Sequence, residues 1–130
     1  MTAHIQTLSA AAFVALVCSF FLVSYTVHAA STIPLCEIQR GLAVGATGED
    51  VRCLQRYLNW SGVQIASTGA GAPGNETAYY GPLTASAVSR WQESHAAQVL
   101  TPLGLSSGTG YWGSASFAAY IELVKKEMGW

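Results

Sequence analysis

Apolar side chains recur at helical spacing in three stretches of the chain. The first stripe begins at Val51 and continues to Leu58 within an arc of about 100° on a helical wheel. Residues 47–50 form a capping-box pattern with Thr47 as the cap, which predicts the start of this helix. Gly62 follows the last apolar position. The pattern therefore predicts a first helix between Thr47 and Gly62.

A second helix is predicted to start at residues 81–82, because proline suits the first helical position. It should continue until Thr101 and Pro102 stop it. The residues that share its apolar face are Thr84, Ala87, Val88, Trp91 and His95. A loop over residues 63–81, rich in Gly, Ala and Ser, separates it from the first helix.

A third helix should follow residues 113–114 and end at Gly129, a residue suited to a helix C-terminus. Its apolar positions fall within an arc of about 60° and are Phe117, Ile121, Val124 and Met128. A second long loop, residues 101–113, precedes it. The three stretches together predict an all-α fold, a small three-helix bundle with two long loops.

The N-terminal part differs in charge from the rest. All 13 Lys, Arg, Asp and Glu side chains lie between Glu37 and Glu127, and residues 10–27 form an uncharged, mostly apolar run. Small residues follow this run, which is the layout of a signal peptide over residues 1–30. An uncleaved run of this length would instead anchor the chain in a membrane. In either case we expect residues 31–130 to form one domain that is secreted or held in the cell envelope.

Charge and residue type exclude several function classes. The formal net charge is −1 and the basic residues form no cluster beyond Lys125 and Lys126, which argues against nucleic-acid binding. His95 lies on an apolar stripe, so we expect it to be half-buried and hydrogen-bonded rather than a metal ligand. No catalytic set, metal site or cofactor site stands out, so we expect a protein that is not an enzyme and needs no cofactor.

Cys36 and Cys53 are the two cysteines that follow the predicted signal. An even pair in an oxidising compartment favours a disulfide over two free thiols. The disulfide would close a loop of about 17 residues and stabilise the fold by about 3 kcal/mol on the chain-entropy estimate. A catalytic cysteine would need a positioned histidine, and only His95 follows the signal.

The chain also repeats itself. The Val-x-x-Leu-Gln pattern from Val51 recurs from Val88, with Trp91 in place of leucine, and the turn from Tyr80 recurs from Trp112. Both turns place a hydroxyl three residues after their glycine, where it could satisfy amides at a helix start. The glutamines of the repeat, Gln55 and Gln92, are expected to tie a helix to a neighbouring loop.

These motifs closely resemble the peptidoglycan-binding domain family, over about residues 40–124. The residues that carry the resemblance are Gly45-x-x-Gly48-x-Asp50-Val51-x-x-Leu54-Gln55-x-x-Leu58, Tyr80-Gly81-x-x-Thr84-x-x-Ala87-Val88-x-x-Trp91-Gln92 and Gly110-x-Trp112-Gly113. The resemblance implies a small three-helix, non-catalytic module that binds peptidoglycan. The loop at residues 63–79 is longer than usual for the family, and the cysteine pair is not part of its pattern.

The residues expected to bind the ligand lie around the two glycine turns. Aromatic side chains that the helical stripes do not use offer flat faces with a hydrogen-bonding tip, which suit sugars and short peptides. The candidates are Tyr79, Tyr80, Tyr111 and Trp112, with Asn75, Glu76 and Thr77 from the loop and Gln92 from the second helix. Tyr80 and Trp112 have a structural alternative, since either could fill the core above its turn.

Two functions fit this sequence. The first is an exported module that binds peptidoglycan, through its glycan or its stem peptide, without cleaving it. The alternative is an envelope protein–protein interaction module that recruits or regulates a separate cell-wall hydrolase.

Overall fold

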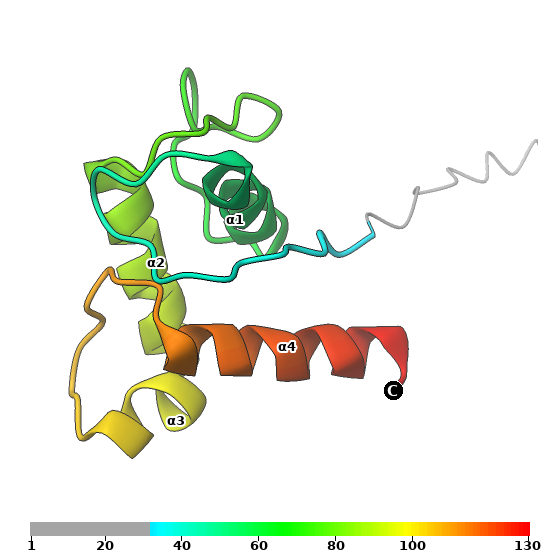
Figure 1. The fold of residues 1–130 in the computed structure, drawn as a ribbon, viewed down its shortest axis with the longest axis vertical. Helices are drawn as coiled ribbons and strands as arrows, with labels where there is room; N and C mark the ends of the chain where they lie inside the picture. The colour runs from blue at the N-terminus through cyan, green and yellow to red at the C-terminus, as the bar shows by residue number, and fades with distance from the viewer. Residues whose placement is uncertain (1–31) are drawn as a thin grey trace, which may run out of the picture.

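A computed structural model describes residues 32–130, and these form a helical fold (Figure 1). Its elements are α1 (Glu49–Trp60), α2 (Pro82–Ser94), α3 (Ala96–Val99), the 3-10 helix η1 (Thr101–Leu103) and α4 (Ser114–Met128). Within this range there is no strand, only the isolated bridges Leu42–Trp112 and Thr47–Tyr79. The all-α prediction is confirmed, whereas the predicted count of three helices is wrong because the structure has four α-helices.

The predicted signal or anchor, residues 1–30 with the apolar run 10–27, lies outside the described residues. Among residues 32–130, no helix combines the length and the apolar character needed to span a bilayer.

The second predicted helix is interrupted at His95. The α2 helix ends at Ser94, and His95 has φ −118° and ψ 32°, which is not helical. Its Nδ1 lies 2.8 Å from the Trp91 carbonyl oxygen, and its ring lies 4.4 Å from the Trp91 ring. The half-buried, hydrogen-bonded His95 is thus confirmed. The apolar stripe continues into α3, so periodicity alone did not reveal the break.

Four aromatic side chains occupy the centre of the core. Tyr57 of α1 lies 4.6 Å from Tyr120 of α4 and 6.0 Å from Trp91 of α2, measured between ring centroids. Trp112, which directly precedes α4, lies 4.7 Å from Trp91. Burial raises the pKa of Tyr57 to about 12. This cluster joins all three long helices, so each depends on the others for its packing.

The strap, residues 32–48, crosses the molecule between α1 and α4 and then runs up beside α2 (Figure 1). The predicted disulfide is confirmed and attaches Cys36 of the strap to Cys53 of α1. The Tyr120 hydroxyl accepts a hydrogen bond from the Cys36 amide and donates one to the Pro34 carbonyl, both at 2.8 Å. The strap is therefore fixed to α1 by a covalent bond and to α4 by buried hydrogen bonds.

The α4 helix buries a different face from the predicted one. Its buried residues are Ser116, Ala119, Tyr120 and Val124, whereas Phe117 and Ile121 are half-buried and Met128 is 40% exposed. This face is rotated because the Tyr120 hydroxyl reaches the strap and Ser116 accepts a hydrogen bond from Gln92. Polar partners, which the apolar pattern does not report, decide the rotation.

The start of α1 also differs from the capping-box prediction. Gly48 occupies the cap position with φ 149°, a conformation that favours glycine, and no side chain caps the helix. The Thr47 carbonyl instead accepts a hydrogen bond from Arg40 at 2.7 Å. The guanidinium also binds Asp50 through two hydrogen bonds of 2.8 and 3.1 Å. This ion pair fixes the strap at the beginning of α1.

Candidate functional site

A buried glutamine of α1 holds the turn that precedes α2. The Gln55 Nε2 group donates to the Tyr79 carbonyl at 2.9 Å and to the Thr84 hydroxyl at 3.0 Å. Its Oε1 accepts the Thr77 N–H at 2.7 Å. Gln55 is only 1% exposed, so these bonds form away from bulk water, where an unpaired amide is costly.

Gln92 of α2 repeats this arrangement at the turn that precedes α4. Its Nε2 donates to the Tyr111 carbonyl at 2.7 Å and to the Ser116 hydroxyl at 3.0 Å, and its Oε1 accepts the Thr109 N–H at 2.8 Å. The prediction that both glutamines tie a helix to a loop is confirmed. The hydroxyls of Thr84 and Ser116 accept from these amides and do not cap their helices, which corrects the predicted capping role.

The two glutamines hold the backbone of two tyrosines whose rings are exposed. Tyr79 is 51% exposed and Tyr111 is 50% exposed. Each ring covers the glycine two residues later: a Cβ added to Gly81 would lie 3.1 Å from the Tyr79 ring, and one added to Gly113 would lie 2.7 Å from the Tyr111 ring. A Cβ on Gly41 of the strap would also collide with the Tyr111 hydroxyl. Glycine therefore allows both rings to lie flat against the backbone.

A small cleft adjoins each ring. The Tyr79 cleft has a volume of about 210 Å³ and is lined by Gln55, Ile65, Ala70, Gly71, Thr77, Tyr79, Gly81, Pro82, Leu83 and Thr84. The Tyr111 cleft has a volume of about 230 Å³ and is lined by Gln92, Val99, Leu100, Leu103, Leu105, Thr109, Tyr111, Gly113, Ser114, Ala115 and Ser116. The two linings contain the same repeated glutamine, threonine, tyrosine and glycine, so the sequence repeat places the same residue types at two clefts of similar volume.

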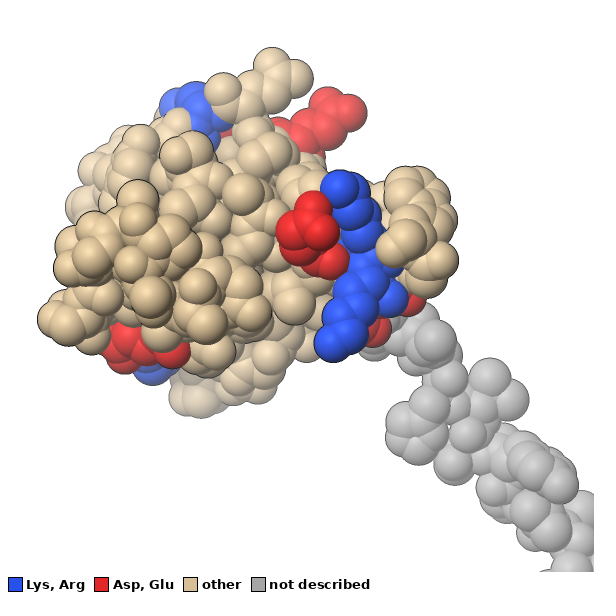
Figure 2. All heavy atoms as spheres, turned by 90° about the horizontal axis from the view of Figure 1, so that it is seen from below, with Lys and Arg blue, Asp and Glu red and all other residues tan. Residues whose placement is uncertain are grey.

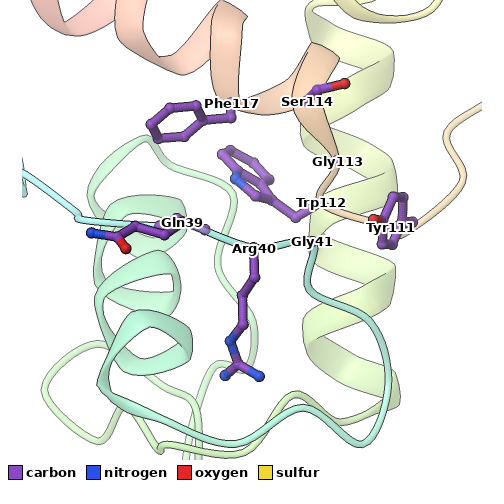
Figure 3. A pocket seen from close by; sticks show the side chains of 9 residues that line it. Gln39, Arg40, Gly41, Tyr111, Trp112, Gly113, Ser114 and Phe117 are labelled. Carbon is purple, nitrogen blue, oxygen red and sulfur yellow. The ribbon is translucent and has the colours of Figure 1, made fainter.

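On its other side, Tyr111 borders the wide groove, an open depression of about 620 Å³. Its lining residues are 38–41 of the strap together with residues 111–114 and Phe117. Figure 3 shows the Trp112 indole between Phe117 and the strap, with Tyr111 at the far end. The Trp112 Nε1 group has no hydrogen-bond partner among residues 32–130. Because Trp112 is 1% exposed, the ring surface that the groove offers is that of Tyr111 and the half-buried Phe117.

Arg40 does not direct its charge into the wide groove. In Figure 3 its guanidinium points away from Trp112, and it is bound to Asp50. The hydrogen bond from Arg40 holds the pKa of the Asp50 carboxyl below its usual range, because it stabilises the ionised form. The groove therefore presents aromatic faces and backbone rather than a free charge.

The predicted ligand residues fall into different environments. Tyr80 and Trp112 are 0% and 1% exposed, so they fill the core above their turns, as the structural alternative expected. Burial raises the pKa of the Tyr80 phenol, whose hydroxyl donates to the Gly110 carbonyl at 2.6 Å. Gln92 is also buried and is fully used in the turn. These three side chains support the surface rather than form it.

The loop candidates are held among themselves and by α1. Burial opposes ionisation of Glu76, but hydrogen bonds from the Asn59 amide and the Gly74 N–H outweigh it and lower the pKa of the Glu76 carboxyl. The Thr77 side chain lies against Gln55, while Asn75 is exposed and its backbone pairs with Gly71. Only Tyr79 and Tyr111 among the predicted residues present a large exposed ring.

The strap side of the wide groove was absent from the sequence-based candidates. The segment that contains Gln39, Arg40 and Gly41 has no helical periodicity. The apolar stripe of the third predicted helix placed Phe117 in the core rather than at a groove. The sequence signal for this segment was the glycine at position 41 followed by Leu42, a pair that belongs to none of the recognised motifs. The structure shows that Leu42 is buried. Sequence spacing cannot show that this segment meets Tyr111, because the two are about 70 residues apart.

Figure 2 shows where charge lies on the face formed by α3 and α4. Most of the charged side chains in this view lie on its right, with smaller charged groups at the upper edge and the lower left, and most of the surface is uncharged. Among residues 32–130, no group of three or more His, Cys, Asp and Glu side chains could hold a metal ion.

A comparison with protein families finds a match for the part of the chain that contains α1, α2 and α3. Residues 47–99 match the family model described as "Putative peptidoglycan binding domain". The match confirms the resemblance for residues 47–99, which contain the second motif and most of the first, whereas the third motif at Gly110–Gly113 lies outside them. No curated protein and no solved structure gives a significant match.

The matched segment runs from just before α1 to the end of α3. It contains the aromatic turn at Tyr79 and the glutamines Gln55 and Gln92. The lining of the wide groove, from the strap and from residues 111–117, lies outside the matched residues. The wide groove is therefore a surface that the family match does not describe.

Proposed function

We propose that this chain is an exported, non-catalytic module that binds peptidoglycan, and that the exposed ring of Tyr111 is a main contact with the ligand. The family match over residues 47–99 is the observation that carries the proposal. The half-exposed ring of Tyr111, held by Gln92 and supported by Gly113, is the surface that best suits a sugar or a short peptide.

Export is supported by the disulfide together with the predicted signal. The Cys36–Cys53 bond forms readily in an oxidising compartment, where peptidoglycan is also found. A non-catalytic role is supported by the family match, since the matched family is described as a binding domain.

The proposal is tested by sedimentation with insoluble peptidoglycan. The full chain, kept in mild detergent because of the apolar run at residues 10–27, is mixed with isolated cell walls without reductant. Tyr111→Ala is compared with Trp130→Ala, which removes an aromatic ring that is 83% exposed and lies outside the grooves. We expect the wild type and Trp130→Ala to sediment, and Tyr111→Ala to stay largely in solution.

The outcomes separate the function from the site. Sedimentation of all three proteins would keep the function and refute Tyr111 as the binding residue. Failure of the wild type to sediment, with its near-ultraviolet circular dichroism intact, would refute peptidoglycan binding itself. Circular dichroism of Tyr111→Ala checks that lost binding does not reflect unfolding.

The recruitment of a separate cell-wall hydrolase is the second candidate function. The exposed leucines Leu103 and Leu105, 58% and 40% exposed beside Tyr111, favour it because they could pack against a protein partner. In this case a hydrolase would remain bound to the module after peptidoglycan has been digested, and substitution of Leu103 by Asp would release it.

A further inference from the structure

The Tyr79 cleft and the Tyr111 cleft are two copies of one arrangement. In each, a buried glutamine holds the N–H of a threonine and the carbonyl of a tyrosine. In each, the tyrosine ring is about half exposed and lies against a glycine. The clefts have nearly equal volumes, about 210 and 230 Å³. Similar volumes and the same repeated residue types predict the same kind of ligand at both.

The charge of the two clefts restricts that ligand. Neither lining contains Asp, Glu, Lys, Arg or His. A stem peptide brings carboxylates and amines, which would lose water in these clefts without gaining an opposite charge. An N-acetylated sugar is neutral, has an apolar face for an aromatic ring, and carries hydroxyl and acetamido groups for hydrogen bonds.

The tyrosine hydroxyls retain their hydrogen-bonding capacity, and that of Tyr111 lies against Gly41 of the strap. The hydroxyl groups of Tyr79 and Tyr111 form no hydrogen bond within residues 32–130, although both rings are fixed through their backbone. A ring held in place in the free protein loses little conformational freedom when a sugar stacks on it.

We propose that the two clefts are equivalent binding sites for neutral N-acetylated sugar units, so that the module contacts one glycan strand at two points. This inference rests on the proposed function and specifies which part of peptidoglycan is bound. The Tyr79 cleft is the new site, and the Tyr111 cleft shares its ring with the wide groove.

The strap links the two turns that carry the sites. It bridges Trp112 through Leu42 and Tyr79 through Thr47. Five residue steps of fully extended chain span at most about 18 Å, so the two bridges lie no farther apart than this. The Tyr80–Gly110 hydrogen bond also joins the two turns directly. The proposal requires one oligosaccharide to reach both sites, and binding at two points would strengthen attachment without new contacts at either.

The test is an NMR titration of the full chain in detergent with di-N-acetylchitobiose and with its tetramer. We expect the disaccharide to shift signals at both clefts, and the shifts to persist when the salt concentration is raised. Tyr79→Ala should remove the shifts at the Tyr79 cleft and leave those at the Tyr111 cleft, and Tyr111→Ala should do the reverse. Either substitution should weaken tetramer binding about fivefold, the size expected for one ring. Trp130→Ala is the matched control and should bind like the wild type.

Several results would overturn the inference. These are disaccharide shifts at one cleft only, displacement of the disaccharide by a stem tripeptide, and unchanged tetramer affinity in Tyr79→Ala. If one of these is found while cell walls still sediment the protein, the proposed function stands and the two-site inference fails. If cell walls do not sediment the folded wild type but both clefts bind the disaccharide, the function fails and the sugar sites remain.

Discussion

Replacing Gln92 by glutamate tests whether the buried glutamine holds the Tyr111 turn. The carboxylate keeps the acceptor that binds the N–H groups of Thr109 and Gly110, at 2.8 and 3.1 Å. It loses the donor that binds the Tyr111 carbonyl at 2.7 Å, and the Ser116 hydroxyl can rotate to donate to it. The change therefore isolates one buried hydrogen bond and adds one buried charge.

The loss follows from the burial of this site. Gln92 is 2% exposed, so the Tyr111 carbonyl would face a carboxylate oxygen with little water between them. Leaving a buried acceptor without its donor costs about 1–3 kcal/mol, and the buried carboxylate adds to it. We expect Gln92→Glu to lower the free energy of unfolding at pH 7 by about 3 kcal/mol.

The loss should depend on pH. Burial and the facing carbonyl raise the pKa of the new carboxyl above the value of about 4.3 that it has in the unfolded chain. The folded variant then binds more protons than the unfolded one between these two pKa values, so its stability falls as the pH rises through this interval. Near pH 4 the protonated carboxyl can donate to the Tyr111 carbonyl, and most of the lost stability should return.

The assay is urea unfolding at pH 4 and pH 7, followed by tryptophan fluorescence. The control is Gln98→Glu, the same chemical change at an exposed position of α3, which should unfold like the wild type at both pH values. The reasoning would be refuted if Gln92→Glu were as stable as Gln98→Glu at pH 7.

Three further predictions concern the strap. Reduction of Cys36–Cys53 should lower the free energy of unfolding by about 3 kcal/mol, measured by urea unfolding with and without reductant. Because Arg40 lowers the pKa of Asp50, the ion pair stabilises the fold fully above the unfolded pKa near 3.8. This stabilisation is lost as the pH falls through the lower pKa of the folded state. Asp50→Asn should therefore flatten the acid branch of a thermal-unfolding pH series. Tyr120→Phe leaves the buried amide of Cys36 without its acceptor and should cost about 1–3 kcal/mol, whereas an unchanged midpoint of unfolding would show that this bond contributes nothing.

Helix positions and the main buried residues could be predicted from sequence. Val51, Leu54, Val88 and Trp91 are fully buried, as their spacing predicted, because an amphipathic helix must place one face against the core. The break at His95 and the rotation of α4 could not be predicted. Both depend on hydrogen bonds to partners on other elements or to the preceding turn, and apolar periodicity carries no information about them.

The candidate site was predictable only in part. Tyr79 and Tyr111 stood out because they flank glycine turns and lie off the apolar stripes, and the structure leaves both rings exposed. Tyr80 and Trp112, one residue later, are buried instead. Successive side chains of extended chain point to opposite sides, so which of each pair faces water depends on where the core lies.

The sequence by itself determined the helical class, the disulfide partners, the family resemblance of residues 47–99 and the internal repeat, because each is expressed in local spacing or residue type. Tertiary structure alone decided that the repeat becomes two neutral clefts and that the strap completes the wide groove. Grooves form between segments that are distant in the chain, and the packing of Gln55, Gln92 and the aromatic core sets the positions of those segments.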